Sequence, residues 1–367
     1  MNIDNNVLKN DEKIIFNLRS LYSKYGYSQF KMSKFEEYDM YVANKDFLIS
    51  DNVITFTDTS GKLMALKPDV TLSILKTTKD IKGYVQKLYY NENVYRISKG
   101  TDAFKEIMQV GLECIGDVDA YSICEVLLLA AKSLKKISKD AVLDISNISI
   151  IAEVLDGVDS NIRSQILKCI SEKNIFELSK IAKENGIDDD KLCLLKSLIS
   201  IYGKPEKVIP QLKATFTSDT AKAVISQFEQ IVEMFKEEEL IDMLRIDFSV
   251  VNTIKYYNGI VFKGFVQGVP QSVLSGGQYD KLMQKMGRKS KAIGFAVYLD
   301  VLESLDDSQN DYDVDILIAY DEQTSLKDLN KMTNMFINDG NTVLAQRDNY
   351  SKIKYKKLVD LTKGGKE

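Results

Sequence analysis

The sequence SGGQYDKLMQKMG (275–287), with AIGFAVYLDVL (292–302) close behind it, decides how the fold is interpreted. Glycines interrupt the apolar residues of both stretches. Two strands are expected directly before them, at 244–251 and 259–266, because both segments are rich in apolar and β-branched residues. This part of the chain therefore predicts several strands of one sheet.

Further strands are expected much earlier in the chain. Segments 85–96 and 109–115 predict a pair of strands joined by the polar loop 98–105. Between them and the later strands, residues 149–239 are rich in Lys, Glu and Leu and follow a helical pattern. A sheet begun before this block and completed after it favours an α+β fold, an antiparallel sheet flanked by helices and interrupted by a helical insertion, over a doubly wound βαβ fold.

The amino-terminal segment predicts a helix and short strands. Apolar residues recur at three- and four-residue spacing over 11–25, and Gly26 provides a natural helix end. Alternating segments at 30–35, 53–57 and 62–66 predict strands, the last two joined as a hairpin.

The carboxyl-terminal segment predicts a separate small α/β domain. The polar string DDSQNDYD (306–313) is the best linker in the chain. It is followed by an expected strand at 314–320, a helix at 325–338 and a strand at 342–346. The predicted domains are a core (1–148 with 240–305), a helical insertion (149–239) and a carboxyl-terminal domain (306–367).

Composition excludes several kinds of chemistry. The 367 residues contain no histidine, so a mechanism that needs an imidazole base or a histidine metal ligand is excluded. No catalytic residue, metal site or cofactor is expected. With 49 basic and 53 acidic residues the formal net charge is -4, and no dense basic stripe is present, which makes tRNA binding unlikely.

The four cysteines and the hydropathy pattern predict a cytoplasmic protein without a membrane span. Cys114, Cys124, Cys169 and Cys193 are scattered, with no CxxC pair and no secretory leader before them, so reduced thiols are expected. The longest apolar run, 126–131, is too short to cross a bilayer.

The string ALKPDVT (65–71) resembles the LRPE/D-x-T signature of histidyl-tRNA synthetases, which are class II aminoacyl-tRNA synthetases. Aspartate at its acidic position is similar to the ATP phosphoribosyltransferase regulatory subunits, the non-catalytic paralogues of these synthetases. The resemblance implies that Asp69 and Thr71 bind the amino group of histidine.

The string VYRISKGTDAFKEIMQVGLECIG (94–116) resembles the second motif of the same synthetases. It implies that Arg96 stands at the position of the arginine that holds ATP and the substrate carboxylate in the synthetases, and that Gln109 and Glu113 face the amino acid. These last two alternate with Gly111, so on a strand all three share one face. An ordinary solvated strand face is the other interpretation.

The string NTIKYYNGIVF (252–262) stands where histidyl-tRNA synthetases have a histidine-specific RGLDYYTG. Asn252 replaces the catalytic arginine, a cation whose electrostatic contribution is usually large. The resemblance implies that Tyr256, Tyr257 and Tyr279 form walls of the histidine pocket. Aromatic residues in strands are more often simple core, which is the alternative for all three.

The opening stretch resembles the third, glycine-rich motif of these synthetases. Tyr298 and Val301 stand where the family has a glycine and the arginine that clamps ATP. A tyrosine ring fills space that adenine needs, and valine cannot balance triphosphate charge. The resemblance therefore implies a pocket for histidine without the machinery that forms an adenylate.

Together these motifs imply a regulatory subunit of ATP phosphoribosyltransferase. Such a subunit activates the short-form catalytic subunit at the first step of histidine biosynthesis and conveys feedback inhibition by histidine. Phe35-Glu36 resembles the end of the dimer-forming first motif, so a homodimer within a hetero-oligomer is expected. The alternatives are a histidyl-tRNA synthetase, which would need arginines near Asn252 and Val301, and a synthetase-like scaffold or translation regulator.

Overall fold

The computed structural model describes residues 8–43, 53–97, 103–251, 257–305, 312–347 and 352–362. The chain divides into two compact units, Met1–Ser304 and Leu305–Glu367, and each is described by itself. The finer division of the first unit into a core and an inserted helical domain stays a prediction.

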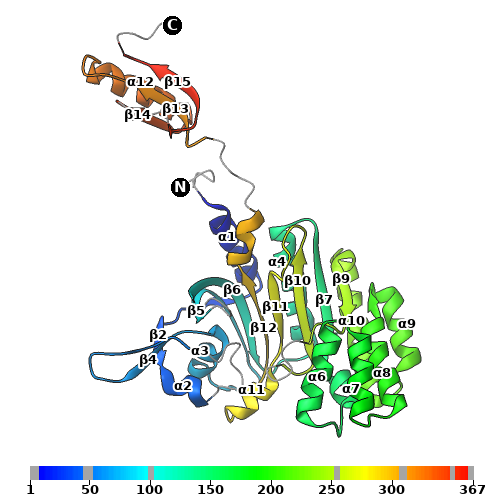
Figure 1. Ribbon diagram of the computed structural model, residues 1–367. Coiled ribbons are helices and arrows are strands. Elements are labelled where there is room, and N and C mark those ends of the chain that lie inside the picture. Colours follow the sequence, from blue (N-terminus) through cyan, green and yellow to red (C-terminus); the bar gives the residue numbers. More distant parts are fainter. Residues whose placement is uncertain are drawn as a thin grey trace. The chain divides into compact units, whose positions relative to one another are not determined.

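One long sheet organises the first unit (Figure 1). In spatial order its described strands are β1 (Ser28–Gln29), β5 (Val85–Ile97), β6 (Phe104–Gly116), β12 (Lys291–Tyr298), β11 (Leu274–Gln278), β10 (Ile260–Val266), β7 (Ala141–Asn147), β9 (Leu244–Asp247) and β8 (Tyr202–Gly203).

The pairing joins strands that are distant in sequence. β6 lies between β5 and β12, and the register of the second pair places Glu113 opposite Gly294 and Gln109 opposite Tyr298. All pairs from β5 to β7 are antiparallel, whereas the β1–β5 and β7–β9 pairs are parallel. The sheet begun before the helical block is completed after it, as predicted.

Two helices pack on one face of this sheet. Helix α4 (Ala120–Ile137) contacts β7, β10 and β12, and helix α1 (Asn10–Lys24) contacts α4, β5 and β6. The Asp119 side chain caps α4 by accepting a hydrogen bond from Ser122 N at 2.8 Å. Because this face is covered, the pocket-forming side chains lie on the opposite face.

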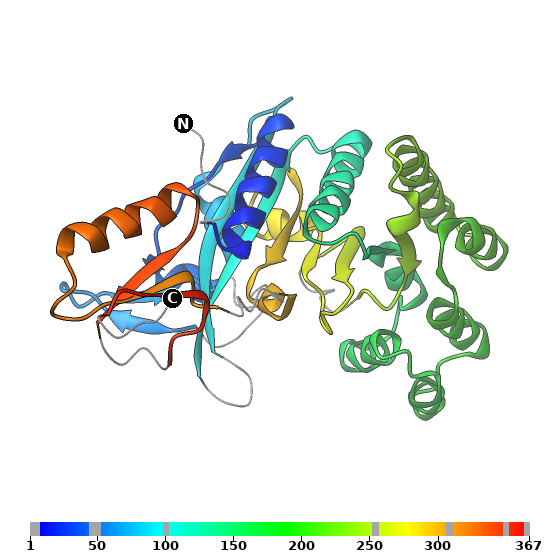
Figure 2. The ribbon, with the colours of Figure 1, turned by 90° about the horizontal axis from the view of Figure 1, so that it is seen from above.

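The residues after β7 form a helical group at one end of the sheet, which Figure 2 shows in green. Its helices are α5 (Ile148–Val154), α6 (Ser160–Ser171), α7 (Ile175–Glu184), α8 (Asp189–Ser200), α9 (Pro205–Thr215) and α10 (Asp219–Glu237), and the short 3-10 helix η2 (Ile241–Met243) leads back into the sheet. This agrees with the helical pattern predicted for 149–239.

A smaller antiparallel sheet lies beside the long one. Its order is β2 (Phe35–Glu37), β4 (Leu63–Leu66) and β3 (Thr55–Thr57). Near it are the short helices α2 (Tyr38–Ala43), α3 (Val70–Thr77) and α11 (Asp280–Lys285), and the 3-10 helix η3 (Asp300–Leu305) follows β12. Buried apolar residues of α3, β5 and α11 form one core cluster with Tyr41.

The carboxyl-terminal unit has a parallel sheet ordered β14 (Val343–Gln346), β13 (Val314–Ala319) and β15 (Tyr355–Asp360), with helix α12 (Leu326–Asn338). The prediction missed β15 and also β7. The strand predicted at 30–35 is wrong: β1 ends at Gln29, and β2 begins only at Phe35. The strand predicted at 244–251 ends at Asp247.

Candidate functional site

A cavity of about 330 Å³ lies over strands β6, β10, β11 and β12. Its lining includes every predicted site residue that the structure describes, namely Asp69, Thr71, Arg96, Gln109, Glu113, Tyr257 and Tyr279. Tyr256 lies outside the described residues, as do Asn252 and Lys255. Motifs that are far apart in sequence therefore meet at one cavity.

Glu113 is the most strongly held polar group of the cavity. Its side chain is buried, Thr71 Oγ1 donates to its Oε1 at 2.7 Å, and the Tyr279 hydroxyl donates to its Oε2. Burial raises the pKa of Glu113 to about 8, against the two hydrogen bonds that lower it. The site thus contains a carboxyl that burial keeps largely protonated near neutral pH.

Asp69 lines the cavity and also stabilises a helix. It is the N-cap of α3, and its Oδ1 accepts a hydrogen bond from Leu72 N at 3.0 Å. Burial raises the pKa of its carboxyl, while the backbone bond and the nearby Arg96 oppose the shift. Arg96 itself donates from Nε to Pro68 O at 3.1 Å, which ties β5 to the start of the helix.

Glycines make room for the Glu113 side chain. A Cβ added at Gly294, directly opposite on β12, would overlap the Glu113 carboxylate and the Leu112 carbonyl oxygen. A Cβ at Gly276 would overlap the Gly294 carbonyl oxygen and the Phe295 side chain. These two glycines therefore have steric causes: at Gly294 the Glu113 carboxylate approaches the sheet, and at Gly276 the neighbouring strand β12 does.

Aromatic side chains form the walls of the cavity. Tyr279 is buried, and burial raises the pKa of Tyr257 and of Tyr90 well above the usual tyrosine value. Tyr90 was not predicted as a site residue, because on β5 it resembles ordinary core. Tyr90 lines the cavity, and the charges of Glu113 and Asp69 add to the effect of burial in raising its pKa.

Tyr298 ends strand β12 and lines the cavity. Its hydroxyl lies 2.6 Å from Ser275 Oγ on the neighbouring strand β11. Val301 lies beyond it, in the 3-10 helix η3. Tyr298 is therefore the last residue of a strand, and its side chain forms part of the cavity wall.

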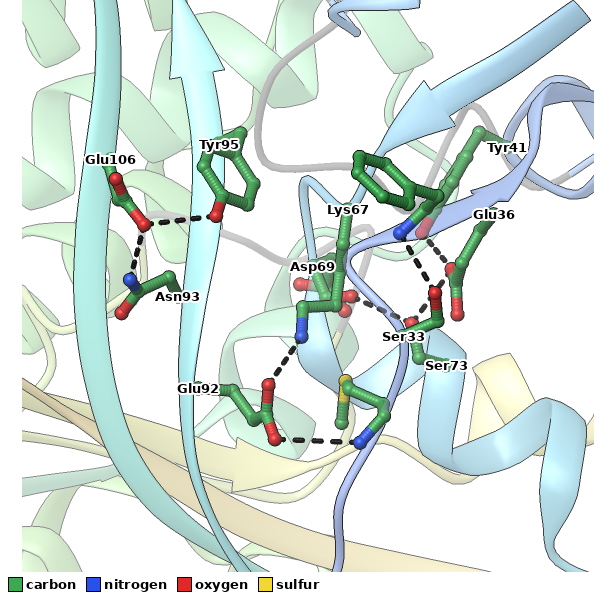
Figure 3. Close-up of polar contacts among 12 residues, drawn as sticks. Ser33, Glu36, Tyr41, Lys67, Asp69, Ser73, Glu92, Asn93, Tyr95 and Glu106 are labelled. Atoms are coloured by element: carbon green, nitrogen blue, oxygen red, sulfur yellow. Dashed lines mark hydrogen bonds and ion pairs between the residues drawn. The ribbon is translucent and has the colours of Figure 1, made fainter. Parts of the chain in front are cut away.

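A polar network supports the segment that carries Asp69 (Figure 3). Lys67 is buried, and its Nζ donates to Glu92 Oε2 at 2.8 Å, which joins the end of β4 to β5. On the other side, Ser73 Oγ donates to Glu36 Oε2 at 2.9 Å and Tyr41 donates to the same oxygen. Contacts of Lys67 and of Ser73 thus hold the segment on both sides of Asp69.

Two lining residues, Gln109 and Lys263, have no hydrogen-bond acceptor for their side-chain nitrogen among the described residues. Gln109 is buried, and within the described structure its Nε2 has no hydrogen-bond acceptor. Lys263 on β10 also lines the cavity and was missed by the sequence analysis. A single lysine in an otherwise apolar strand gives no signal by itself. In the described part of the chain, no group of three or more acidic or cysteine side chains is arranged to hold a metal ion.

The family model described as "Histidyl-tRNA synthetase" matches residues 3–302, most of the chain. The chain belongs to the histidyl-tRNA synthetase family. The fold class predicted from the sequence, a class II synthetase-like antiparallel sheet with helices, is confirmed by the structural neighbours of this family.

Within this family, the similar proteins include regulatory subunits. The ATP phosphoribosyltransferase regulatory subunit of Oceanobacillus iheyensis is 28% identical over 80% of this chain and 73% of that protein. The Bacillus halodurans structure described as an ATP phosphoribosyltransferase regulatory subunit/histidyl-tRNA synthetase has a TM-score of 0.76 at 22% identity, covering 96% of this chain and 94% of that one.

A chain of the ATP phosphoribosyl transferase (HisG:HisZ) complex from Thermotoga maritima has a TM-score of 0.63 at 20% identity, covering 80% of this chain and 98% of that one. The resemblance to ATP phosphoribosyltransferase regulatory subunits that the motifs indicated is therefore confirmed. Among the described residues, the helices are all too short or too polar to cross a membrane.

Proposed function

We propose that this chain is a non-catalytic regulatory subunit of ATP phosphoribosyltransferase. It activates the short-form catalytic subunit at the first step of histidine biosynthesis, and histidine inhibits the enzyme through it. The name of the Oceanobacillus iheyensis relative and the Thermotoga maritima complex support the role and the partner. The observation that carries the proposal is the cavity, which is lined by the buried carboxyls of Asp69 and Glu113.

The cavity suits a small cationic amino acid. An ammonium group beside Glu113 and Asp69 would stabilise their charged forms and so offset the cost of burying them. Tyr257 and Tyr279 provide aromatic walls for a ring, and Thr71 orients the Glu113 carboxylate at 2.7 Å. Histidine has the charge, the ring and the size that this lining requires.

The absence of synthetase chemistry is part of the proposal. Asn252 and Val301 stand where the family has its catalytic and ATP-binding arginines. Tyr298 supports the same conclusion, because it stands where the family has a glycine, and its side chain lines the cavity and is hydrogen-bonded to Ser275 at 2.6 Å. At Asn252 and Val301 the chain therefore has no cation for the triphosphate.

Inhibition requires that histidine bind one state of the complex more tightly than the other. The coupling free energy in such systems is typically about 1–3 kcal/mol, which shifts affinity by roughly five- to 150-fold. A homodimer through the first motif, combined with catalytic subunits, is the assembly we propose.

The test is phosphoribosyl-ATP formation by the short-form catalytic subunit of the same organism, with and without this chain. The proposal predicts co-elution of the two proteins and a rate at least tenfold above that of the catalytic subunit alone. A rate that stays unchanged, with no co-elution, would contradict it and favour the scaffold or translation regulator. Formation of histidyl-adenylate from histidine and ATP would favour the synthetase instead.

A further inference from the structure

Glu113 is a buried acid whose hydrogen-bond partners carry no positive charge. The groups that bond to its carboxyl are the hydroxyls of Thr71, at 2.7 Å, and of Tyr279. A hydroxyl both donates and accepts, so these two groups suit a carboxylate and a carboxylic acid equally. The buried Glu125 of α4 differs, because Lys87 Nζ lies 2.6 Å from its carboxylate. Among the described residues, Glu113 therefore has partners for both of its protonation states but no ion pair.

Asp69 adds to the cost of a negative charge on Glu113. The two carboxyls are buried, line one cavity and interact electrostatically. Arg96 lies close enough to Asp69 to favour its charged form. Lys263, the other cation of the described lining, is on β10, and β12 and β11 separate it from the strand of Glu113. Where two buried carboxyls share one site and a cation favours only one of them, the other keeps its proton.

The other groups around Glu113 do not compensate a charge on it. Burial raises the pKa of Tyr90 and of Tyr257 well above the usual tyrosine value, and it raises the pKa of Cys114 to about 12. The residues directly opposite Glu113 on the neighbouring strands are uncharged, namely Gly294 on β12 and Leu88 on β5. A proton exchanged near neutral pH at this end of the described cavity therefore belongs to its two carboxyls.

We propose that the ammonium group of the amino-acid ligand replaces the proton of Glu113, so that binding of the ligand releases one proton. The O–H bond of the carboxyl breaks, the proton passes to the solvent, and the carboxylate pairs with the ammonium group; no bond within the ligand changes. The exchange adds no net charge to the buried site. The inference rests on the proposed function, because it takes a cationic amino acid as the ligand of this cavity.

Proton release makes feedback inhibition depend on pH. Burial gives Glu113 a pKa of about 8, so about half of the free protein is ionised at this residue at pH 8 and about a tenth at pH 7. The apparent affinity follows the ionised fraction, and histidine should bind about fivefold more weakly at pH 7 than at pH 8. The imidazole of the ligand titrates mainly below this range, near pH 6.5. Inhibition by histidine therefore weakens as the pH falls.

Isothermal titration calorimetry of the full chain with histidine at pH 7, repeated in buffers of different ionisation enthalpy, counts the released protons. Glu113→Gln cannot release this proton, so it should release about one proton fewer than wild type. Its affinity should also lack the fivefold change between pH 7 and pH 8. Glu106→Gln, on the same strand outside the cavity, is the control and behaves as wild type. The groups of the ligand titrate alike in all three proteins, so the difference isolates Glu113.

Infrared difference spectroscopy of the same proteins does not depend on a high affinity of the variant. In wild type and Glu106→Gln at pH 7, histidine should remove the carbonyl band of a protonated carboxyl, and Glu113→Gln should lack this change. A band that persists in wild type with bound histidine would overturn the proposal.

Equal proton release by wild type and Glu113→Gln would also overturn it, as would absence of histidine binding to the wild-type chain. Failure of the proposed function has a different signature, because it is measured as the rate of the wild-type complex. A chain that releases the proton on binding histidine but does not activate the catalytic subunit would contradict the proposed function and support the proton exchange.

Discussion

Glu113 lies in the proposed binding site, and the charged form of its carboxyl lowers the stability of the fold. Its carboxyl is buried, and its pKa is about 8 in the folded chain instead of 4.5. The unfolded chain therefore loses this proton at a lower pH than the folded chain does. Stability from this group is fully present below pH 4.5 and is lost as pH rises towards 8.

The expected loss between pH 6 and pH 8 is about 2 kcal/mol in the free energy of unfolding. Glu113→Gln removes the titrating group but keeps acceptor and donor atoms, so its stability changes much less across this window. Urea unfolding at the two pH values measures both. A smaller dependence of stability on pH should remain in Glu113→Gln, because the pKa of Asp69 is also raised. Equal slopes in wild type and variant would show that Glu113 does not titrate in this range.

Single residues of the site differ in how far the sequence predicts them. Asp69, Gln109 and Glu113 stand in motif strings, and all three line the cavity. The steric reason for Gly294 becomes visible only when β12 is placed beside β6. Lys263 was missed because a single lysine in an apolar strand gives no signal, and its place at the cavity is visible only in three dimensions.

At the scale of elements, Asp69 connects the cavity to helix α3. Because its side chain caps the helix, the two obvious substitutions have different consequences. Asparagine is as good an N-cap as aspartate, whereas alanine loses the cap hydrogen bond, so Asp69→Ala should be less stable than Asp69→Asn by about 1 kcal/mol. Thermal or urea unfolding measures the difference.

The matched control is Asp119, which caps α4 in the same way but does not line the cavity. The alanine and asparagine variants of Asp119 should differ in the same direction. If Asp69→Asn and Asp69→Ala are equally stable while the Asp119 pair differs, the cap at α3 does not contribute to stability. Asp69→Asn is therefore the variant that tests charge in the cavity without disturbing the helix.

The Lys67–Glu92 pair joins the small sheet to the long one. Lys67 is fully buried and Glu92 nearly so, with side-chain exposures of 0% and 16%. Glu92→Gln leaves a buried ammonium without a counter-charge and should destabilise the chain by about 3 kcal/mol. Lys67→Met combined with Glu92→Gln should recover part of this loss, because no charge then remains unpaired.

Urea unfolding of wild type, Glu92→Gln and the double variant measures these differences in the free energy of unfolding. Lys62→Met, which removes one partner of the exposed Lys62–Glu37 pair in the same region, should change stability very little. A double variant that is less stable than Glu92→Gln would contradict the assignment, since the cost would then come from lost packing of the lysine stem.

The elements predicted best are the long ones, in which the hydrophobic pattern repeats several times. The helix expected at 11–25 is found at Asn10–Lys24, and the strands at 85–96 and 109–115 extend further as β5 and β6. Residues 30–35 alternate like a strand, but β1 pairs through Ser28 and Gln29, just before this segment, and of the segment itself only Phe35 lies in a strand, β2. β15 carries two lysines and pairs only with β13, so its sequence resembles a polar loop.

At the scale of the whole molecule, the chain has the sheet of its family, and a cavity lies over it. The order β6-β12-β11-β10 places residues from four separate parts of the sequence on one face. Local patterns do not predict this meeting, because β12 pairs with β6, which lies far earlier in the sequence. The family resemblance supplied it, and the structure supplied the contacts that give each residue a physical role.

The central claim is that this pocket senses histidine for the catalytic complex. The most direct test is the histidine concentration that half-inhibits phosphoribosyl-ATP formation by the complex, measured for wild type and Glu113→Gln. Glu106→Gln, a change on the same strand outside the cavity, is the control. The account predicts at least a tenfold higher concentration for Glu113→Gln alone. Identical inhibition of all three proteins would contradict it and place the histidine site elsewhere.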